Sequence, residues 1–219
     1  MRYDRVAGVL YVPLFLLGPF ALLYVRNTVV VPGDAAATAE RIAVHGGLFR
    51  IGSVAELIIP LLDVALALVF YVLLKPVNAP IALLAAFFRL VTAALILASA
   101  ATNFAALQTA QSPDLALLLL NLHQHLLAIG MVTFGVHLLL LGYLIWVSSL
   151  LPRFVGVLLM VASVGYVANS IRVLLLLDWT TPVRSLVLLP AFVAELSLML
   201  WLLIKGTQPV SRPSHVVSS

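Results

Sequence analysis

Six apolar runs, each long enough to cross a lipid bilayer as a helix, constrain this 219-residue chain more than any other feature. A helix needs about 20 apolar residues to cross the roughly 30 Å hydrocarbon core of a bilayer. Inside that core, backbone polar groups must be bonded within the protein, so successive apolar runs predict a helix bundle. We therefore predict an all-α polytopic membrane protein, a bundle of six transmembrane helices at 6–25, 47–74, 81–107, 115–147, 154–177 and 185–204.

Charged residues make up 9% of the sequence, whereas a soluble globular domain has about 25%. A soluble domain therefore has no room beside the spans, and residues 1–205 are predicted to form a single transmembrane domain. The remaining residues, 206–219, are mostly polar and are predicted to form a short disordered cytoplasmic tail. The sequence contains no cysteine, which excludes disulfides and thiolate chemistry.

The distribution of Lys and Arg predicts the orientation of the spans. Six spans place both termini on one side of the membrane, and the segments on that side hold Arg2, Arg5, Lys75, Arg153, Lys205 and Arg212. The opposite loops hold three arginines, Arg26, Arg41 and Arg184. Because cytoplasmic loops of membrane proteins collect Lys and Arg, both termini are predicted to be cytoplasmic. The same rule accounts for the net charge of +4, so we expect the lipid bilayer as the partner and do not expect nucleic-acid binding. Assembly into a homo-oligomer is left open.

The longest predicted loop, 26–44, contains a Pro-Gly turn followed by Asp34 and an alanine-rich run. Asp is a preferred residue at helix N-termini, so a short helix at the membrane surface is expected to begin after Asp34. This helix is expected to break at Gly46 and Gly47, before the second span. Arg26, at the start of the loop, is expected to lie outside the bundle.

Charged residues within the spans are the first candidates for function, because each costs at least about 2.5–3.5 kcal/mol at the bilayer centre. They form a neutral set, as mutual pairing predicts: Arg50, Arg89, Arg172, Glu56, Asp63 and Glu195. At 1.5 Å per residue, Asp63 and Arg89 come to similar depths, and Arg172 and Glu195 come within roughly 7–8 Å. We therefore predict these two ion pairs, with Arg50 in the outer half of the bundle at the depth of the fourth-span histidines.

Polar residues extend the charged faces at helical spacing, and two interpretations stay open. One is a structural network that fixes helix register. The other is a water-accessible pocket. The forked donors of arginine suit carboxylate and phosphate groups, so this interpretation favours binding or transport of a lipid or another small anionic or amphiphilic ligand. The predicted ligand-binding residues are Arg50, Glu56, Asp63, Arg89, Asn103, Tyr166, Asn169, Arg172 and Glu195.

Histidines in the fourth span offer a second chemistry. His123 and His137 lie fourteen residues apart near one helix face, which permits haem ligation, and His123 or His125 could bind a divalent metal with Glu56 or Glu195. We predict no cofactor and no metal site, and haem or a divalent metal at these histidines is kept as an option. His123 and His125 are also the candidate catalytic residues, as bases beside a carboxylate, although enzyme fingerprints are missing. The alternative functions are therefore an intramembrane enzyme and a non-catalytic membrane subunit or scaffold.

Several stretches suggest a family: YVR at 24–26, VPGDAAATA at 31–39, LFRIG at 48–52, FRLV at 88–91 and LPRFVGVL at 151–158. Over nearly its whole length the chain resembles the bacterial multipass family known as domain of unknown function 4386. The resemblance implies a bacterial plasma (inner) membrane protein. It implies no activity and no catalytic residue, because the family has none assigned.

Overall fold

The computed structural model describes residues 3–148, 150–177 and 179–207, and these are almost entirely helical. Six helical segments are long and apolar enough to cross a membrane, which confirms the predicted all-α six-helix bundle. Most of the predicted tail, residues 208–219, lies outside the described residues. The segments in chain order are α1 (Tyr3–Gly18) continued by the π-helix η1 (Pro19–Val25) and α2 (Arg26–Val29), then α3 (Ala35–Leu74), α4 (Ala79–Gln108), α5 (Pro113–Val147), α6 (Arg153–Leu174) and α7 (Thr181–Ile204).

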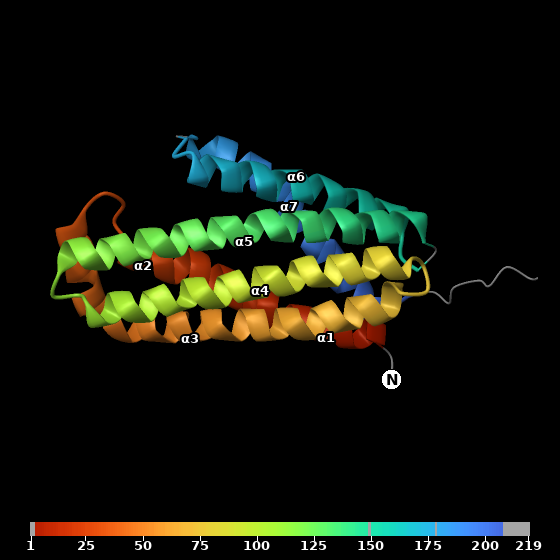
Figure 1. Cartoon of the computed structure of the whole chain (residues 1–219), viewed down its shortest axis with the longest axis horizontal. Coiled ribbons are helices and arrows are strands. Elements are labelled where there is room, and N and C mark those ends of the chain that lie inside the picture. Colours follow the sequence, from red (N-terminus) through yellow and green to blue (C-terminus); the bar gives the residue numbers. More distant parts are fainter. Residues whose placement is uncertain (1–2, 149, 178, 208–219) are drawn as a thin grey trace, which may run out of the picture.

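The spans form a closed ring, because each contacts the next in the order α1, α3, α4, α5, α6, α7 and α7 contacts α1. The long helices α3, α4 and α5 run side by side along the molecule, and the shorter α6 and α7 cover part of its length (Figure 1). Small residues let membrane helices approach closely, and α4 between α3 and α5 has such a surface. Its buried alanines are Ala82, Ala85, Ala86, Ala93, Ala100 and Ala106.

Glycines set the closest approach between α5 and α6. A Cβ atom on Gly142 would lie 2.6 Å from the carbonyl oxygen of Gly156, and a Cβ on Gly156 would lie 2.6 Å from the carbonyl oxygen of Gly142. Lipid tails are as apolar as the side chains they meet, so packing of this kind, rather than hydrophobic burial, holds helices together in a bilayer. The α5–α6 pair is therefore a rigid side of the ring.

The predicted turn and N-cap before the second span are confirmed. Gly33 has the positive φ of 78° that suits glycine, and the Asp34 carboxylate accepts a hydrogen bond from the Ala37 N–H at 2.9 Å. The helix that follows does not end in the loop but continues as α3, with non-helical angles only at His45, next to the predicted break. With 40 residues, α3 is about 60 Å long and projects well beyond a 30 Å core.

The first span changes its winding at Pro19. Proline has no N–H to donate and its ring crowds the carbonyl four residues earlier, so the α-helical pattern cannot continue unchanged. The chain winds as a π-helix up to Val25 and then as α2. Arg26 consequently lies on a continuation of the first span, and its predicted position in the outer loop is wrong.

The two ends of the described chain meet at one end of the bundle, as six spans require. The Thr207 N–H donates to Asp4 Oδ2 at 3.0 Å, and the Arg5 guanidinium donates to the backbone carbonyls of Leu203 and Ile204. These bonds satisfy carbonyl groups that the end of α7 would otherwise leave unpaired. The predicted tail therefore starts beside the beginning of α1.

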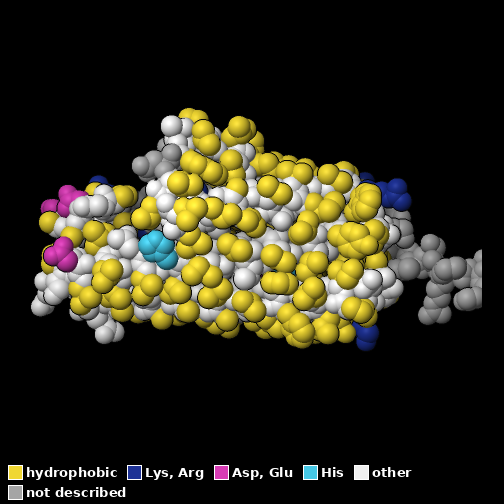
Figure 2. Space-filling view, turned by 45° about the horizontal axis from the view of Figure 1, so that its top comes forward, with side chains coloured by type: hydrophobic (Ala, Val, Ile, Leu, Met, Phe, Trp, Pro, Cys, Tyr) yellow, Lys and Arg dark blue, Asp and Glu magenta, His cyan; other side chains and the backbone are white. Residues whose placement is uncertain are grey.

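Charge divides between the two ends of the bundle, and a broad apolar surface separates them (Figure 2). Lys75, Arg153 and Lys205 are exposed at the end where the chain termini meet. The exposed acidic residues Asp34 and Glu40 lie at the opposite end, near the start of α3. Arg2 and Arg212, which the orientation argument also used, lie outside the described residues, and the orientation itself stays a prediction.

Candidate functional site

The centre of the ring contains a cavity of about 300 Å³, and all six spans contribute to its lining. Asp63 lies about 11 residues before the end of α3, and Arg89 lies about 10 residues after the start of α4. At 1.5 Å per residue both are roughly 15 Å from the helix ends, which is half the thickness of a hydrocarbon core. Most of the walls are apolar, and the polar residues among them are Tyr11, Asp63, Arg89, Thr92, Tyr166 and Glu195.

The mouth of the cavity lies between the first span and α7. Gly18, Pro19 and Leu22 form one edge and Phe192 belongs to the other, and Pro19 and Phe192 are exposed on the surface of the bundle. Within the described residues the backbone of η1 does not come close to that of α7, although the backbone of α1 does. The interruption at Pro19 thus coincides with a lateral opening toward the surface that lipid would cover. Irregular winding of this kind is frequent at functional sites.

Asp63 and Arg89 form the predicted ion pair, which is confirmed. Arg89 Nη2 donates to Asp63 Oδ1 at 2.5 Å, and only 1% of Arg89 is exposed. Aromatic rings surround the guanidinium, with Arg89 Cζ 5.6 Å from the ring centroid of Tyr11, 5.8 Å from that of Phe70 and 5.5 Å from that of Phe134. The negative faces of these rings stabilise the buried cation.

His137 completes the surroundings of Arg89 and has a fixed tautomer. Its Nδ1 lies 2.8 Å from the carbonyl oxygen of Ala85, which can only accept, so Nδ1 carries the proton. Its Nε2 lies 3.0 Å from Arg89 Nη1, which can only donate, so Nε2 accepts. His137 is therefore neutral and acts as a support for Arg89. Sequence analysis grouped His137 with His123 on one helix face as a possible haem ligand and did not predict its contact with Arg89.

The second predicted ion pair, between Arg172 and Glu195, is wrong. Glu195 Oε1 instead accepts a hydrogen bond from the Tyr166 hydroxyl at 2.5 Å, and Arg172 Nε donates to Asn169 Oδ1 at 3.2 Å within α6. Because α6 ends at Leu174 and α7 begins at Thr181, Arg172 and Glu195 differ in depth by about 12 residues, roughly 18 Å. That separation is too large for an arginine side chain to cross.

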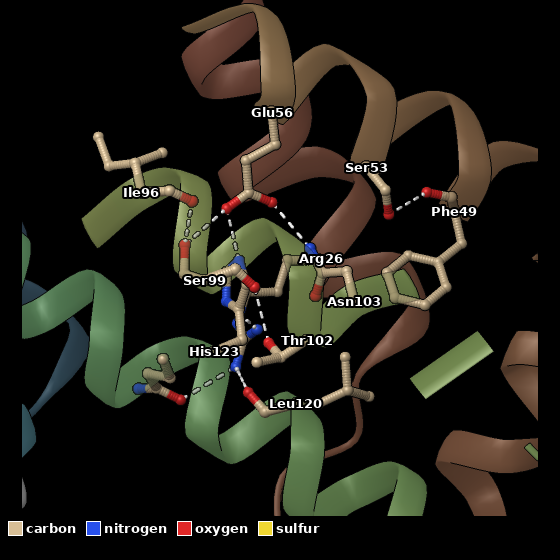
Figure 3. A network of polar contacts seen from close by, with 11 residues as sticks. Arg26, Phe49, Ser53, Glu56, Ile96, Ser99, Thr102, Asn103, Leu120 and His123 are labelled. Carbon is tan, nitrogen blue, oxygen red and sulfur yellow. Dashed lines mark hydrogen bonds and ion pairs between the residues drawn. The ribbon is translucent and has the colours of Figure 1, made fainter. Parts of the chain in front are cut away.

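A second polar cluster surrounds Glu56 of α3, seven residues before Asp63 and farther from the end of the bundle where the termini meet (Figure 3). Its Oε2 accepts from Asn103 Nδ2 at 2.8 Å, and its Oε1 accepts from Ser99 Oγ at 3.3 Å and lies 2.6 Å from His123 Nε2. Only 2% of Glu56 is exposed, so it needs these partners. We call Arg26, Glu56, Ser99, Asn103 and His123 the outer network.

Arg26 supplies the positive charge of the outer network. Its Nη1 lies 3.2 Å from His123 Nδ1, and its Nη2 donates to the Leu120 carbonyl and to Gln124 Oε1. A guanidinium only donates, so His123 Nδ1 accepts and Nε2–H donates to Glu56. A neutral histidine thus bridges Arg26 and Glu56, with the opposite tautomer to His137. Sequence analysis missed Arg26 because the apolar run ends just before it.

The predicted ligand-binding residues divide into three groups in the structure. Those that line the cavity are Asp63, Arg89, Tyr166 and Glu195. Glu56 and Asn103 belong to the outer network. Arg50, which was expected near Glu56, is exposed on the surface of α3, and Asn169 and Arg172 contact each other outside the cavity lining. A role in ligand binding stays a prediction for all nine. Tyr11, which sequence analysis did not select, joins the cavity group.

The candidate catalytic histidines lie in different surroundings. His123 is buried and both of its ring nitrogens have partners, whereas His125 is half-buried. Among the described residues, no three His, Asp or Glu side chains come together in a way that could hold a metal ion. The haem and metal options rest on the sequence spacing alone.

Comparison with known proteins extends the resemblance over the whole bundle. The family model described as a domain of unknown function, DUF4386, matches residues 6–206. An uncharacterized protein of the archaeon Archaeoglobus fulgidus is 32% identical over 162 residues, which is 74% of this chain and 85% of that protein. No solved structure matches the chain.

Proposed function

The chain belongs to the DUF4386 family, and because the family description names no activity, we propose from the site that the protein binds or transports an amphiphilic molecule. The molecule would enter from the bilayer through the lateral mouth and place its polar group at the centre of the ring. The observation that carries this proposal is the cavity itself. It combines apolar walls with a few convergent polar groups, which is the usual composition of a small-molecule site.

The arrangement of charges favours an amphiphile over a simple anion. Arg89 is the one arginine among the cavity-lining residues, and it already forms an ion pair with Asp63 and a hydrogen bond with His137. Arg50 and Arg172, the other two arginines proposed to hold an anionic group, are outside the lining. An anion would therefore have to compete with Asp63 for a single guanidinium.

The proposed setting is the plasma membrane, with both termini in the cytoplasm. The support for this orientation is the placement of Lys75, Arg153 and Lys205, which follow α3, begin α6 and follow α7 at the end where the termini meet. Lys and Arg concentrate on the cytoplasmic side of membrane proteins. In this orientation the outer network and the mouth at Pro19 face the outer half of the bilayer.

Filling the cavity is expected to remove the bound amphiphile. Gly18 lines the cavity, and a Cβ added there meets no heavy atom within 4 Å, so Gly18→Phe adds a large side chain at the cavity wall from a position with free space around its Cβ. Native mass spectrometry of gently solubilised wild-type protein is expected to show a retained amphiphile. The occupancy should fall about tenfold or more in Gly18→Phe, since the two compete for one volume.

The matched control is Gly47→Phe. Gly47 also lies in a helix with nothing within 4 Å of an added Cβ, but it is exposed on α3 and does not line the cavity. Its variant is expected to retain the same amphiphile as the wild type. Equal loss from both variants, or equal retention by both, would place the bound molecule on the general lipid-facing surface and contradict the proposal.

A further inference from the structure

Glu195 is the ionisable cavity residue that lacks an opposite charge. Asp63 pairs with Arg89, whereas Glu195 accepts a hydrogen bond from the neutral hydroxyl of Tyr166. Within the described part of the chain, no Lys, Arg or His forms an ion pair with Glu195. The cavity therefore carries one uncompensated negative charge whenever Glu195 is ionised. Such a charge is costly at this depth in a membrane, so a proton or another cation has to accompany it.

Two carboxylate oxygens of cavity-lining residues have no hydrogen-bond partner. Asp63 Oδ2 and Glu195 Oε2 make no hydrogen bond among the described residues, and both residues line the cavity. Neither oxygen is fully enclosed by protein. When both acidic residues are ionised these two oxygens can only accept, which suits a ligand that brings positive charge or donors.

Aromatic rings provide the rest of the environment that a cation prefers. Their negative faces attract positive charge, as the packing of Arg89 among such rings already shows in this molecule. Phe192 lies three residues before Glu195 on α7, so both occupy one helix face, and its ring is 5.0 Å from that of Phe15. The aromatic residues of the lining are Tyr11, Phe15, Phe134, Tyr166 and Phe192.

We propose that the amphiphile is a lipophilic cation with a single positive charge, which pairs with Glu195 and displaces its proton. This inference rests on the proposed function, whose ligand class it names. In the empty cavity Glu195 holds a proton, and Asp63 and Arg89 neutralise each other. When the cation enters, the Glu195 proton leaves to water and the carboxylate pairs with the ligand. The net charge of the cavity is zero before and after, and one proton is released for each cation bound.

Glu195 is the residue that exchanges the proton, because the groups around it keep their protonation state when the ligand binds. Tyr166 of α6 and Tyr11 of α1 are phenols, which carry no charge near neutral pH. Asp63 of α3 and Arg89 of α4 form the closed ion pair, and His137 of α5 lies behind Arg89 as a neutral acceptor. Glu195 alone can change its charge without leaving another buried charge unpaired.

Tetraphenylphosphonium is a suitable probe, because it is a lipophilic cation that cannot lose a proton. The wild-type protein in detergent is expected to bind it more tightly as pH rises, by up to about tenfold per unit of pH when one proton competes. Titration calorimetry in two buffers of different ionisation enthalpy should show one proton released per bound cation. Glu195→Gln should weaken binding at least about tenfold and abolish the pH dependence, while Gln still accepts from Tyr166.

The control is Glu40→Gln, which removes an exposed carboxylate at the outer end of α3. It is expected to bind the probe like the wild type, and the thermal unfolding of both variants establishes that they are folded. Failure of the wild type to bind, or binding by Glu195→Gln with unchanged affinity and pH dependence, would overturn the cation proposal. If Gly18→Phe nevertheless expels a neutral or anionic amphiphile, the proposed function stands and only its ligand class is wrong.

Discussion

Replacing Asp63 by Ala is expected to destabilise the folded protein by about 3–5 kcal/mol, the usual cost of leaving one member of a buried ion pair alone. Arg89 is 1% exposed, so its guanidinium would be left in surroundings that hydrate it poorly once the carboxylate is lost. The aromatic rings around its guanidinium offset only part of this cost. The measurement is the fraction of protein that stays monodisperse after heating in detergent, compared with the wild type.

A double substitution tests whether the loss of stability in Asp63→Ala comes from the unpaired charge that remains on Arg89. Asp63→Leu with Arg89→Met removes both charges and keeps similar volumes, and such replacements are often neutral. We expect most of the stability to return, with a deficit of about 1–3 kcal/mol because His137 Nε2 loses its donor. Arg50→Ala, which removes an exposed charge, should unfold like the wild type. An Asp63→Ala variant as stable as the wild type would show that Arg89 finds another partner.

Replacing Glu56 by Ala is expected to have the second-largest effect. The substitution leaves the donors of Asn103 and His123 without their acceptor, and each buried unpaired group costs about 1–3 kcal/mol, whereas the Ser99 hydroxyl keeps its hydrogen bond to the Ile96 carbonyl. It also removes the negative charge that balances Arg26 through His123. The same heating assay measures the loss, and the exposed carboxylate Glu40 gives the control variant Glu40→Ala.

A double-mutant cycle tests whether the outer network acts as a unit. If Glu56, His123 and Arg26 are linked as the hydrogen bonds show, the losses from Glu56→Ala and His123→Leu should not add. The expected coupling energy is about 0.5–3 kcal/mol, as for residues in direct contact. Additive losses would mean that the two side chains contribute separately and that the 2.6 Å contact carries no energy of its own.

Sequence could predict the Asp63–Arg89 pair because a tight connection joins their helices. With a short connection between antiparallel spans, the rise per residue fixes relative depth, and depth decides which charges can meet. The same counting failed for Arg172 and Glu195 because the helix ends were misplaced. Apolar residues continue past Leu174, but the chain leaves the helix there and passes through Leu176 with a positive φ of 54°. A hydropathy profile cannot detect this helix end, because the residues that follow it are also apolar.

The sequence also could not predict how each helix is rotated about its own axis. Arg50 and Glu56 are six residues apart on α3, which separates them by about 120° around the helix, but only the structure shows that Glu56 is the one that faces the bundle and that Arg50 is exposed. Arg26 was missed for a related reason, because the π-helical winding after Pro19 carries it across to α5. The cavity itself depends on all six rotations together, so no single span could reveal it.

An experimental density map of the protein in lipid nanodiscs tests the central claim most directly, which is that the ring of helices holds an amphiphile in a laterally open cavity. The account predicts elongated density that enters between η1 and α7, runs past Phe192, and ends within hydrogen-bonding distance of Asp63 or Glu195. A map in which η1 packs against α7 and side chains fill the space between Tyr11 and Glu195 would contradict it.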